Sequence, residues 1–424
     1  MVLFLFGCQM GQSTDVESVS VSQPEGERSG FSDQVESSDW PSDFPAEQDL
    51  GLIFDTDDVA IVEAETLTPY GDSFLPYRWV TAVSRGYENT DVGDALDIEN
   101  HYSEWRLVSM RIVPCAPLGV ATSQDPDSFC WPMVRLVWQP VIQDLRLSWG
   151  ITVDYADDRA IHALYPVQPR DSDGYMYTSQ YREELAGYLK QGGLAKDISE
   201  AFYQEFSKER DATARWLLDQ TFALRDPGLK TGSWSTLDLR SEWSSADEVA
   251  DKFQNRLISF LGEVAHPDQL TELTSFSLPE GREPAHLDSW VFVAFEGIRG
   301  NIYPVDLQVF DVETGKELIN MGPTQTVSMV TEDPIVQAAI DEGNSQLAAQ
   351  VIANTDDLST KTEAIADPEQ FLVPNTSCAS CHKLNDTRFD FHNFSFLEDR
   401  NITISPRVEK DISFDRNWVS QFLD

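Results

Sequence analysis

Basic residues are scarce in this sequence, which has 30 lysines and arginines against 72 aspartates and glutamates among 424 residues. The formal net charge of −42 argues against nucleic acid as a ligand, because phosphate binding depends on clustered lysine and arginine. Electrostatic adsorption to anionic lipid is disfavoured for the same reason. Because an acidic excess also keeps a protein soluble, the charge alone says little about a cationic partner.

Sequence motifs of several enzyme classes are also missing. The chain has no Gly-x-Ser-x-Gly nucleophile elbow, no Walker phosphate loop, no His-Glu-x-x-His zinc motif and no Rossmann glycine fingerprint. Histidine is rare, and four of the six histidines are scattered singly: His101, His162, His266 and His286. We expect these four to be structural or surface residues rather than ligands, and His162 to lie in the core, since an apolar run surrounds it.

Two of the five cysteines form a motif with the histidine that follows them, Cys378-Ala379-Ser380-Cys381-His382. This Cys-x-x-Cys-His sequence resembles the haem-attachment motif of c-type cytochromes. The resemblance implies one covalent haem c, with both thiols bonded to the vinyl groups on one edge of the porphyrin. The adjacent imidazole then becomes an axial ligand of the iron.

Two other chemistries use the same spacing. A zinc site would take its ligands from Cys378, Cys381, His382 and His392, and a Cys-x-x-Cys pair alone can form a redox disulfide. Zinc is less favoured because adjacent Cys and His ligands are crowded around one ion and no second Cys-x-x-Cys follows. A thioredoxin-like disulfide would follow a strand in a βαβ unit, which the surrounding sequence does not predict.

The sixth ligand of the iron stays open. Small soluble cytochromes c supply a downstream methionine, but no methionine follows His382 in this chain. His392 is the nearest candidate; because ten helical residues span about 15 Å, the chain would have to reverse between the two histidines. The alternatives are Met321 or Met329 from the preceding part of the chain, or an open site. Two histidine ligands would lower the potential relative to His/Met, and an open site would permit peroxide or gas chemistry.

The N-terminus carries a second short motif. Leu5-Phe6-Gly7-Cys8 resembles the lipobox of bacterial lipoproteins, which implies export and acylation of Cys8. In that family a residue other than aspartate after the cysteine, here Gln9, implies sorting to the outer membrane. We interpret the first eight residues as a truncated signal, because only seven residues precede Cys8 and none of them is basic. The alternative is an apolar N-terminus without a targeting role.

Residues 9–65 predict a disordered, acidic tether. They hold 15 acidic residues and one basic residue, Arg28, for a net charge of −14, and they are rich in serine, glutamine and proline. Such a composition cannot bury enough apolar surface to offset the entropy of ordering. A flexible chain of this length spans on the order of 40 Å and would lift the folded part off a membrane.

Residues 66–330 are long enough for a substantial core and form the predicted body. Alternating and helical apolar patterns mark its elements. The expected strands are 105–113, 134–141, 145–153, 160–165, 290–296 and 305–311, and the expected helices are 181–190, 195–224 and 246–261. Because strands, helices and strands follow in that order, the expected fold class is α+β, with a largely antiparallel sheet and flanking helices.

Cys115 and Cys130 lie between the first two expected strands, at the ends of a turn-rich loop of 14 residues. In an oxidising compartment these two cysteines are expected to form a disulfide. Closing a loop of this length contributes about 3 kcal/mol in the chain-entropy account. The cysteines are then all assigned: one to lipid, two to the disulfide and two to haem.

The remaining sequence is interpreted as a helical connector over residues 331–374 and a haem segment over residues 375–424. Because 50 residues rarely bury enough surface to fold alone, we expect the haem segment to pack on the body. The segment carries seven large aromatic residues: Phe389, Phe391, Phe394, Phe396, Phe414, Trp418 and Phe422. Either the stretch 389–396 lines the porphyrin, or these rings only attach the tail to the body.

The favoured function is that of an exported, lipid-anchored protein that carries electrons on one haem c. The resemblances imply the bacterial cell envelope, in the periplasm or at the surface, with the outer membrane as the expected site of anchoring. We expect a redox partner protein, and contact with the membrane through the lipid only. The alternative is a non-redox surface or assembly lipoprotein whose α+β domain binds a partner. Peroxidase-like catalysis is least favoured, because di-haem bacterial peroxidases carry a second Cys-x-x-Cys-His.

Overall fold

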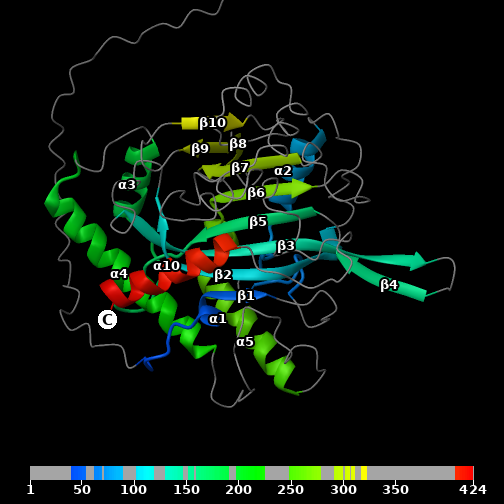
Figure 1. Ribbon diagram of the computed structural model, residues 1–424, viewed down its shortest axis with the longest axis horizontal. Coiled ribbons are helices and arrows are strands. Elements are labelled where there is room, and N and C mark those ends of the chain that lie inside the picture. The colour runs from blue at the N-terminus through cyan, green and yellow to red at the C-terminus, as the bar shows by residue number, and fades with distance from the viewer. Residues whose placement is uncertain are drawn as a thin grey trace, which may run out of the picture. The chain divides into compact units, whose positions relative to one another are not determined.

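The protein is described by a computed structural model, in which β-strands form one large antiparallel sheet with helices packed on it (Figure 1). The described residues are 40–53, 62–68, 71–88, 102–118, 129–146, 151–156, 159–190, 197–224, 248–277, 291–298, 301–305, 307–310, 317–321 and 406–423. None of the helices within these ranges is both long enough and apolar enough to cross a membrane.

The main sheet has eight strands in the order β1-β2-β3-β5-β6-β7-β8, with β4 paired to the end of β3. Their bounds are β1 Gly51–Ile53, β2 Trp105–Pro117, β3 Cys130–Arg146, β4 Ile151–Ala156, β5 Arg159–Pro166, β6 Glu272–Ser277, β7 Val291–Ile298 and β8 Asn301–Val305. A separate antiparallel pair is formed by β9 Leu307–Phe310 and β10 Glu317–Met321. The strand pairs of the main sheet among the described residues are antiparallel, which agrees with the predicted largely antiparallel sheet.

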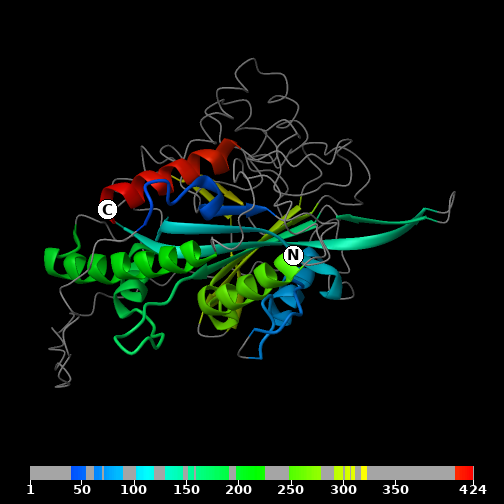
Figure 2. The ribbon, with the colours of Figure 1, turned by 90° about the horizontal axis from the view of Figure 1, so that it is seen from below.

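The helices cover both faces of the sheet (Figure 2). Their bounds are α1 Glu47–Leu50, α2 Tyr77–Glu88, α3 Gln180–Lys190, α4 Glu200–Ala223, α5 Glu248–Val264 and α10 Pro406–Phe422, with short 3-10 turns at η2 Tyr102–Glu104 and η6 Pro267–Gln269. Helices α2, α4 and α5 lie on one face, and α1 and α10 lie on the other.

The core lies between these layers. Because both faces of the sheet are covered, β2 buries side chains on both sides and reads as a near-continuous apolar run. Trp105, Leu107, Met110 and Ile112 of β2 are all buried, and Trp138 of β3 is buried beside them. The helices contribute amphipathic faces to the same core.

The predicted fold class is confirmed, with corrections to its elements. Strand 145–153 was expected as one element, but β3 ends at Arg146 and β4 begins at Ile151, so the prediction spans the two arms of a hairpin. Helix α2 and strand β6 were not expected. The helix predicted at 195–224 begins at Glu200, where the Ser199 side chain accepts a hydrogen bond from the Phe202 amide and caps the helix.

The boundary predicted for the disordered tether is wrong at its C-terminal end. Residues 40–53 and 62–68 belong to the folded body, because β1 pairs with β2 and Leu50, Leu52 and Val62 are buried. The remainder of the tether, at 9–39 and 54–61, lies outside the described residues, as do the first eight residues and the connector at 331–374. Within the segment 375–424, the structure describes residues 406–423, most of them in α10.

Candidate functional site

None of the residues expected to hold haem or lipid lies in the described part of the chain. They are Cys8, Cys378, Cys381, His382 and His392. Of the other candidate iron ligands, Met321 ends β10 and Met329 lies outside the described residues. After the Cys-x-x-Cys-His sequence, the described residues are 406–423, and their helix α10 packs on the body. We therefore take the docking site of α10 as the candidate functional site.

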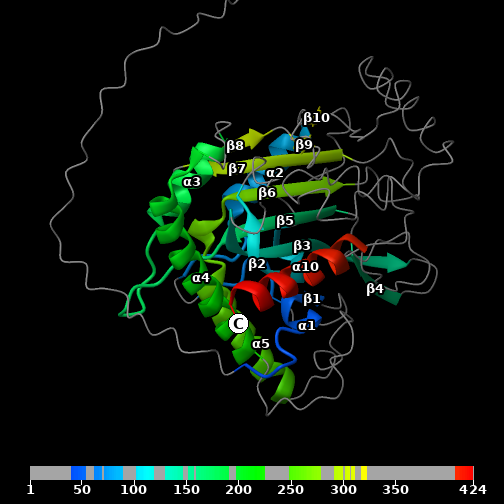
Figure 3. The same ribbon diagram turned by 60° about the vertical axis from the view of Figure 1, so that its left-hand side comes forward.

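Helix α10 starts at Pro406, where the fixed φ of proline and its missing N–H suit the first helical position. The buried apolar residues of α10 are Ile412, Trp418 and Val419, and Leu423 directly after the helix is also buried. Ile412, Val419 and Leu423 are spaced by seven and four positions and share one face of the helix, with Trp418 at the edge of that face. That face packs against β2 and α1, which lie beside the helix in Figure 3.

Two aspartates of α10 bind one buried arginine of the sheet. Arg111 of β2 donates from Nη1 to Asp411 Oδ2 at 3.0 Å and from Nη2 to Asp415 Oδ2 at 2.6 Å. The side chains of the three residues are between 3% and 8% exposed. Water therefore screens these ion pairs little, and removing either partner would leave a charge buried without compensation.

A second arginine stands beside this group. Arg135 of β3 lies directly opposite Arg111 in the β2–β3 register, and its positive charge acts on Asp415. Like charges opposite one another on neighbouring strands repel. The two carboxylates of α10 offset this repulsion, so the sheet and the helix are complementary in charge as well as in shape.

Burial and the neighbouring charges act on the proton of Asp415 in opposite directions. Burial and the neighbouring Asp411 raise the pKa of this carboxyl, Arg111 and Arg135 lower it, and the pKa that results is about 7. Burial also opposes the charge on Arg111, but the two aspartates outweigh burial and raise its pKa. Arg111 is therefore always charged, whereas Asp415 gains or loses its proton near neutral pH.

The end of α10 is held by a buried arginine of α4. Arg210 is 1% exposed, and its Nε donates to Asp211 Oδ1 at 2.7 Å. Its guanidinium carbon lies 5.3 Å from the ring centre of Trp418 and 5.9 Å from that of Phe422. These are cation–π distances, and the burial strengthens the attraction. Of the two roles expected for the tail aromatics, Trp418 and Phe422 therefore have the second: they attach the tail to the body.

The N-terminal part of the body meets the C-terminus on α4. Trp40 Nε1 donates to Asp219 Oδ1 at 2.8 Å, and the guanidinium carbon of Arg215 lies 5.6 Å from the ring centre of Trp40. Arg215 also donates to the carbonyl of Leu423 at the end of α10. Arg416 of α10 donates to the Pro45 carbonyl at 3.0 Å. The segment that contains Trp40 and Pro45 and the helix that follows the Cys-x-x-Cys-His sequence thus form one packed unit.

The disulfide between Cys115 and Cys130 is present, as predicted. It joins the end of β2 to the start of β3, and both residues are buried, so its role is structural. A disulfide in this position fits an oxidising compartment.

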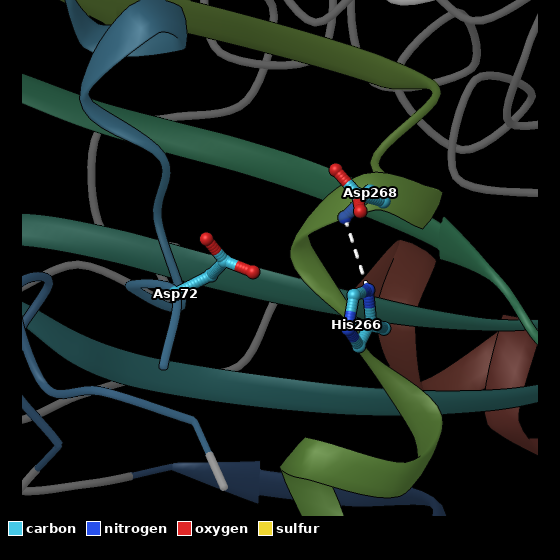
Figure 4. A group of neighbouring side chains, drawn as sticks. All are labelled: Asp72, His266 and Asp268. Atoms are coloured by element: carbon cyan, nitrogen blue, oxygen red, sulfur yellow. Dashed lines mark hydrogen bonds between the residues drawn. The ribbon is translucent and has the colours of Figure 1, made fainter. Parts of the chain in front are cut away.

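One group of three metal-ligating side chains occurs among the described residues: Asp72, His266 and Asp268 (Figure 4). A ligand atom from each lies within 4.8 Å of the others. Asp268 is exposed and also lies 3.8 Å from Arg78. The imidazole of His266 accepts a hydrogen bond from the Asp268 amide at 3.3 Å and caps η6. Asp72 and Asp268 are both exposed, and exposed acidic groups are common without a bound ion.

The other single histidines are only partly covered by the structure. His162 lies in β5 between Val137 of β3 and Thr274 of β6, and it is half-buried rather than deep in the core. His101 and His286 lie outside the described residues.

Sequence reasoning did not find the charged residues that dock α10. A signal was available, because Asp411 and Asp415 are four residues apart and share the helix face of Ile412 and Val419. Carboxylates on an apolar face indicate buried cationic partners. The identity of the partner, Arg111, is set by tertiary structure across 300 residues of sequence.

The sequence was compared with protein-family models, with curated proteins and with solved structures, and no significant match was found.

Proposed function

We propose that this protein is an exported, lipid-anchored carrier of one haem c in the bacterial cell envelope, where it passes single electrons between partner proteins. The observation that carries the proposal is the sequence Cys378-Ala379-Ser380-Cys381-His382. Two thiols and one imidazole within five residues match the donor set for covalent haem attachment and axial ligation.

The proposed attachment needs no group beyond those in the motif and the porphyrin. The thiols of Cys378 and Cys381 each add across a vinyl C=C bond, so that one S–C bond forms and the thiol hydrogen goes to the neighbouring carbon. His382 supplies one axial nitrogen, and its neutral imidazole is the form that ligates. When bound, haem iron supplies a one-electron Fe(III)/Fe(II) couple, with the electron provided and removed by other redox proteins.

Two features of the described residues support this proposal. The Cys115–Cys130 disulfide fits an oxidising compartment, and c-type haem is attached on that side of the bacterial inner membrane. Docking of α10 also ties the sequence after the motif to the body, consistent with the expectation that residues 375–424 pack on it rather than form an independent domain.

The test is a haem assay on protein made with its own N-terminus in bacteria that express a cytochrome c maturation system. We expect a pyridine haemochrome spectrum typical of haem c, colour that survives acid-acetone extraction, and an intact mass increased by one haem. Cys381→Ala should weaken the attachment, and His382→Ala should change the spin state of the iron. The matched control is Cys115→Ser with Cys130→Ser, which removes two cysteines outside the motif and should leave the haem content unchanged.

The anchor is tested separately by Cys8→Ser, which should move the protein from the membrane fraction to the periplasmic fraction without loss of haem. A colourless protein of unchanged mass would contradict the electron-carrier proposal. It would leave the non-redox surface or assembly lipoprotein as the better interpretation.

A further inference from the structure

Helix α10 binds the sheet through charged groups as well as through its buried apolar face. Its face carries two carboxylates, Asp411 and Asp415, which share the single guanidinium of Arg111, one on each terminal nitrogen. Two carboxylates on one guanidinium must lie close to each other. Because burial disfavours the ionised form and the neighbouring carboxylate adds repulsion, Asp415 binds a proton more readily than an isolated aspartate does.

We propose that α10 is a proton-sensitive latch, which binds the sheet tightly when Asp415 is protonated and loosens when this buried carboxyl ionises. The proposal rests on three features of the geometry: all three charged side chains are nearly inaccessible to water, the two carboxylates share one partner, and the site joins the C-terminal helix to a strand 300 residues away. It does not depend on the haem proposal.

The sign of the pH dependence follows from comparing docked and released α10. An aspartate in water has a pKa of 3.8, and burial in the docked state raises the pKa of Asp415 to about 7. The docked state therefore holds the proton more tightly, and its stability is greatest below pH 3.8 and is lost as the pH rises through 7. Between pH 5 and pH 8 the docking constant should fall on the order of 100-fold.

The charged groups around Asp415 come from each element that packs on α10. Arg111 of β2 and Arg135 of β3 favour its ionisation, and Asp411 on the same helix opposes it. Charged groups of α1, α4 and α10 near this site make contacts of their own. These contacts are Glu47 with Arg416, Asp49 with the Ala46 amide, Arg210 with Asp211, and Arg215 with the Leu423 carbonyl.

The experiment measures backbone hydrogen exchange of the full chain by mass spectrometry at several values between pH 5 and pH 8. Rates for peptides from 406–423 are divided by the intrinsic rate at each pH, and helix α5 in the same sample serves as an internal reference. We expect protection of α10 to fall on the order of 100-fold from pH 5 to pH 8, with the midpoint of the ionisation near pH 7. Protection of α5 should change much less.

Two variants test whether ionisation of Asp415, rather than of another group, causes the pH dependence of α10 protection. Asp415→Asn keeps an oxygen for Arg111 but cannot ionise, so α10 of this variant should stay protected from pH 5 to pH 8. Asp173→Asn changes an exposed acid outside α10 and should behave like the unmodified chain. Protection of α10 that is constant, or that increases with pH as for an ordinary buried ion pair, would overturn the proposal. So would an Asp415→Asn chain that keeps the full pH dependence.

Discussion

Replacing Trp418 should release α10 more effectively than any other single change in the tail. The indole is 2% exposed and therefore buries about 200 Å² of apolar surface, which corresponds to about 5 kcal/mol of hydrophobic stabilisation. Stacking of the buried Arg210 guanidinium on the same ring adds about 1–2 kcal/mol. Since alanine retains some contact, we expect Trp418→Ala to cost about 4–5 kcal/mol of α10 docking.

Two measurements distinguish undocking of α10 alone from a loss of stability of the whole body. Hydrogen exchange in α10 reports undocking of the helix alone, and urea unfolding reports the stability of the whole body. Trp418→Phe, which keeps a ring opposite Arg210, should cost less, about 1–2 kcal/mol. Tyr175→Ala removes an aromatic side chain that is 72% exposed and should change neither quantity by more than about 0.5 kcal/mol. A loss below about 1 kcal/mol for Trp418→Ala in both measurements would show that Trp418 does not anchor α10 to the body.

Three further changes test other parts of the structure. Arg111→Met leaves two buried carboxylates without their partner and should weaken α10 docking by about 3–5 kcal/mol at pH 8, measured by hydrogen exchange. Unchanged exchange protection of α10 would contradict the ion-pair geometry. Cys115→Ser with Cys130→Ser should lower the unfolding free energy by about 3 kcal/mol, measured in urea, and a change near zero would show that the disulfide constrains little. Gly297→Ala places a Cβ 3.0 Å from Trp79 and 3.1 Å from the Leu270 carbonyl oxygen and should cost about 1–3 kcal/mol of stability. Gly187→Ala, in α3 with open space around it, is the matched control and should instead stabilise by about 0.5–1 kcal/mol.

The strands that could be predicted are those whose own side chains form the core. β2, β3 and β5 are rich in tryptophan, valine, leucine and isoleucine, and their apolar runs are plain in the sequence. β6 is just as central, but its sequence, Glu-Leu-Thr-Ser-Phe-Ser, is largely polar. Its backbone is satisfied by β5 and β7 on either side, and the Ser275 hydroxyl donates to the Ala160 carbonyl at 2.8 Å. Tertiary pairing, rather than local pattern, decides such a strand.

The misplaced end of the tether has a different cause. Composition averaged over residues 9–65 is acidic and polar, which hides a short segment with two buried leucines, Leu50 and Leu52. A strand of three residues, such as β1, is too short to show a period. Its position is fixed by pairing with β2, a strand that follows more than fifty residues later.

The two ends of α10 mark where the segments from the proposed lipid anchor and from the proposed haem motif join the body. Arg215 contacts both Trp40, where the described body begins, and Leu423, at the end of α10. A helix of 17 residues is about 25 Å long, so the other end of α10, at Pro406, lies about that far from the point where the predicted tether joins the body. In the lipid-anchored protein that we propose, the segment toward the membrane therefore joins the body near the C-terminal end of α10. The segment from the proposed haem motif joins α10 at its N-terminal end. Fixing α10 to the sheet keeps these two points apart, whereas its release would allow them to move independently.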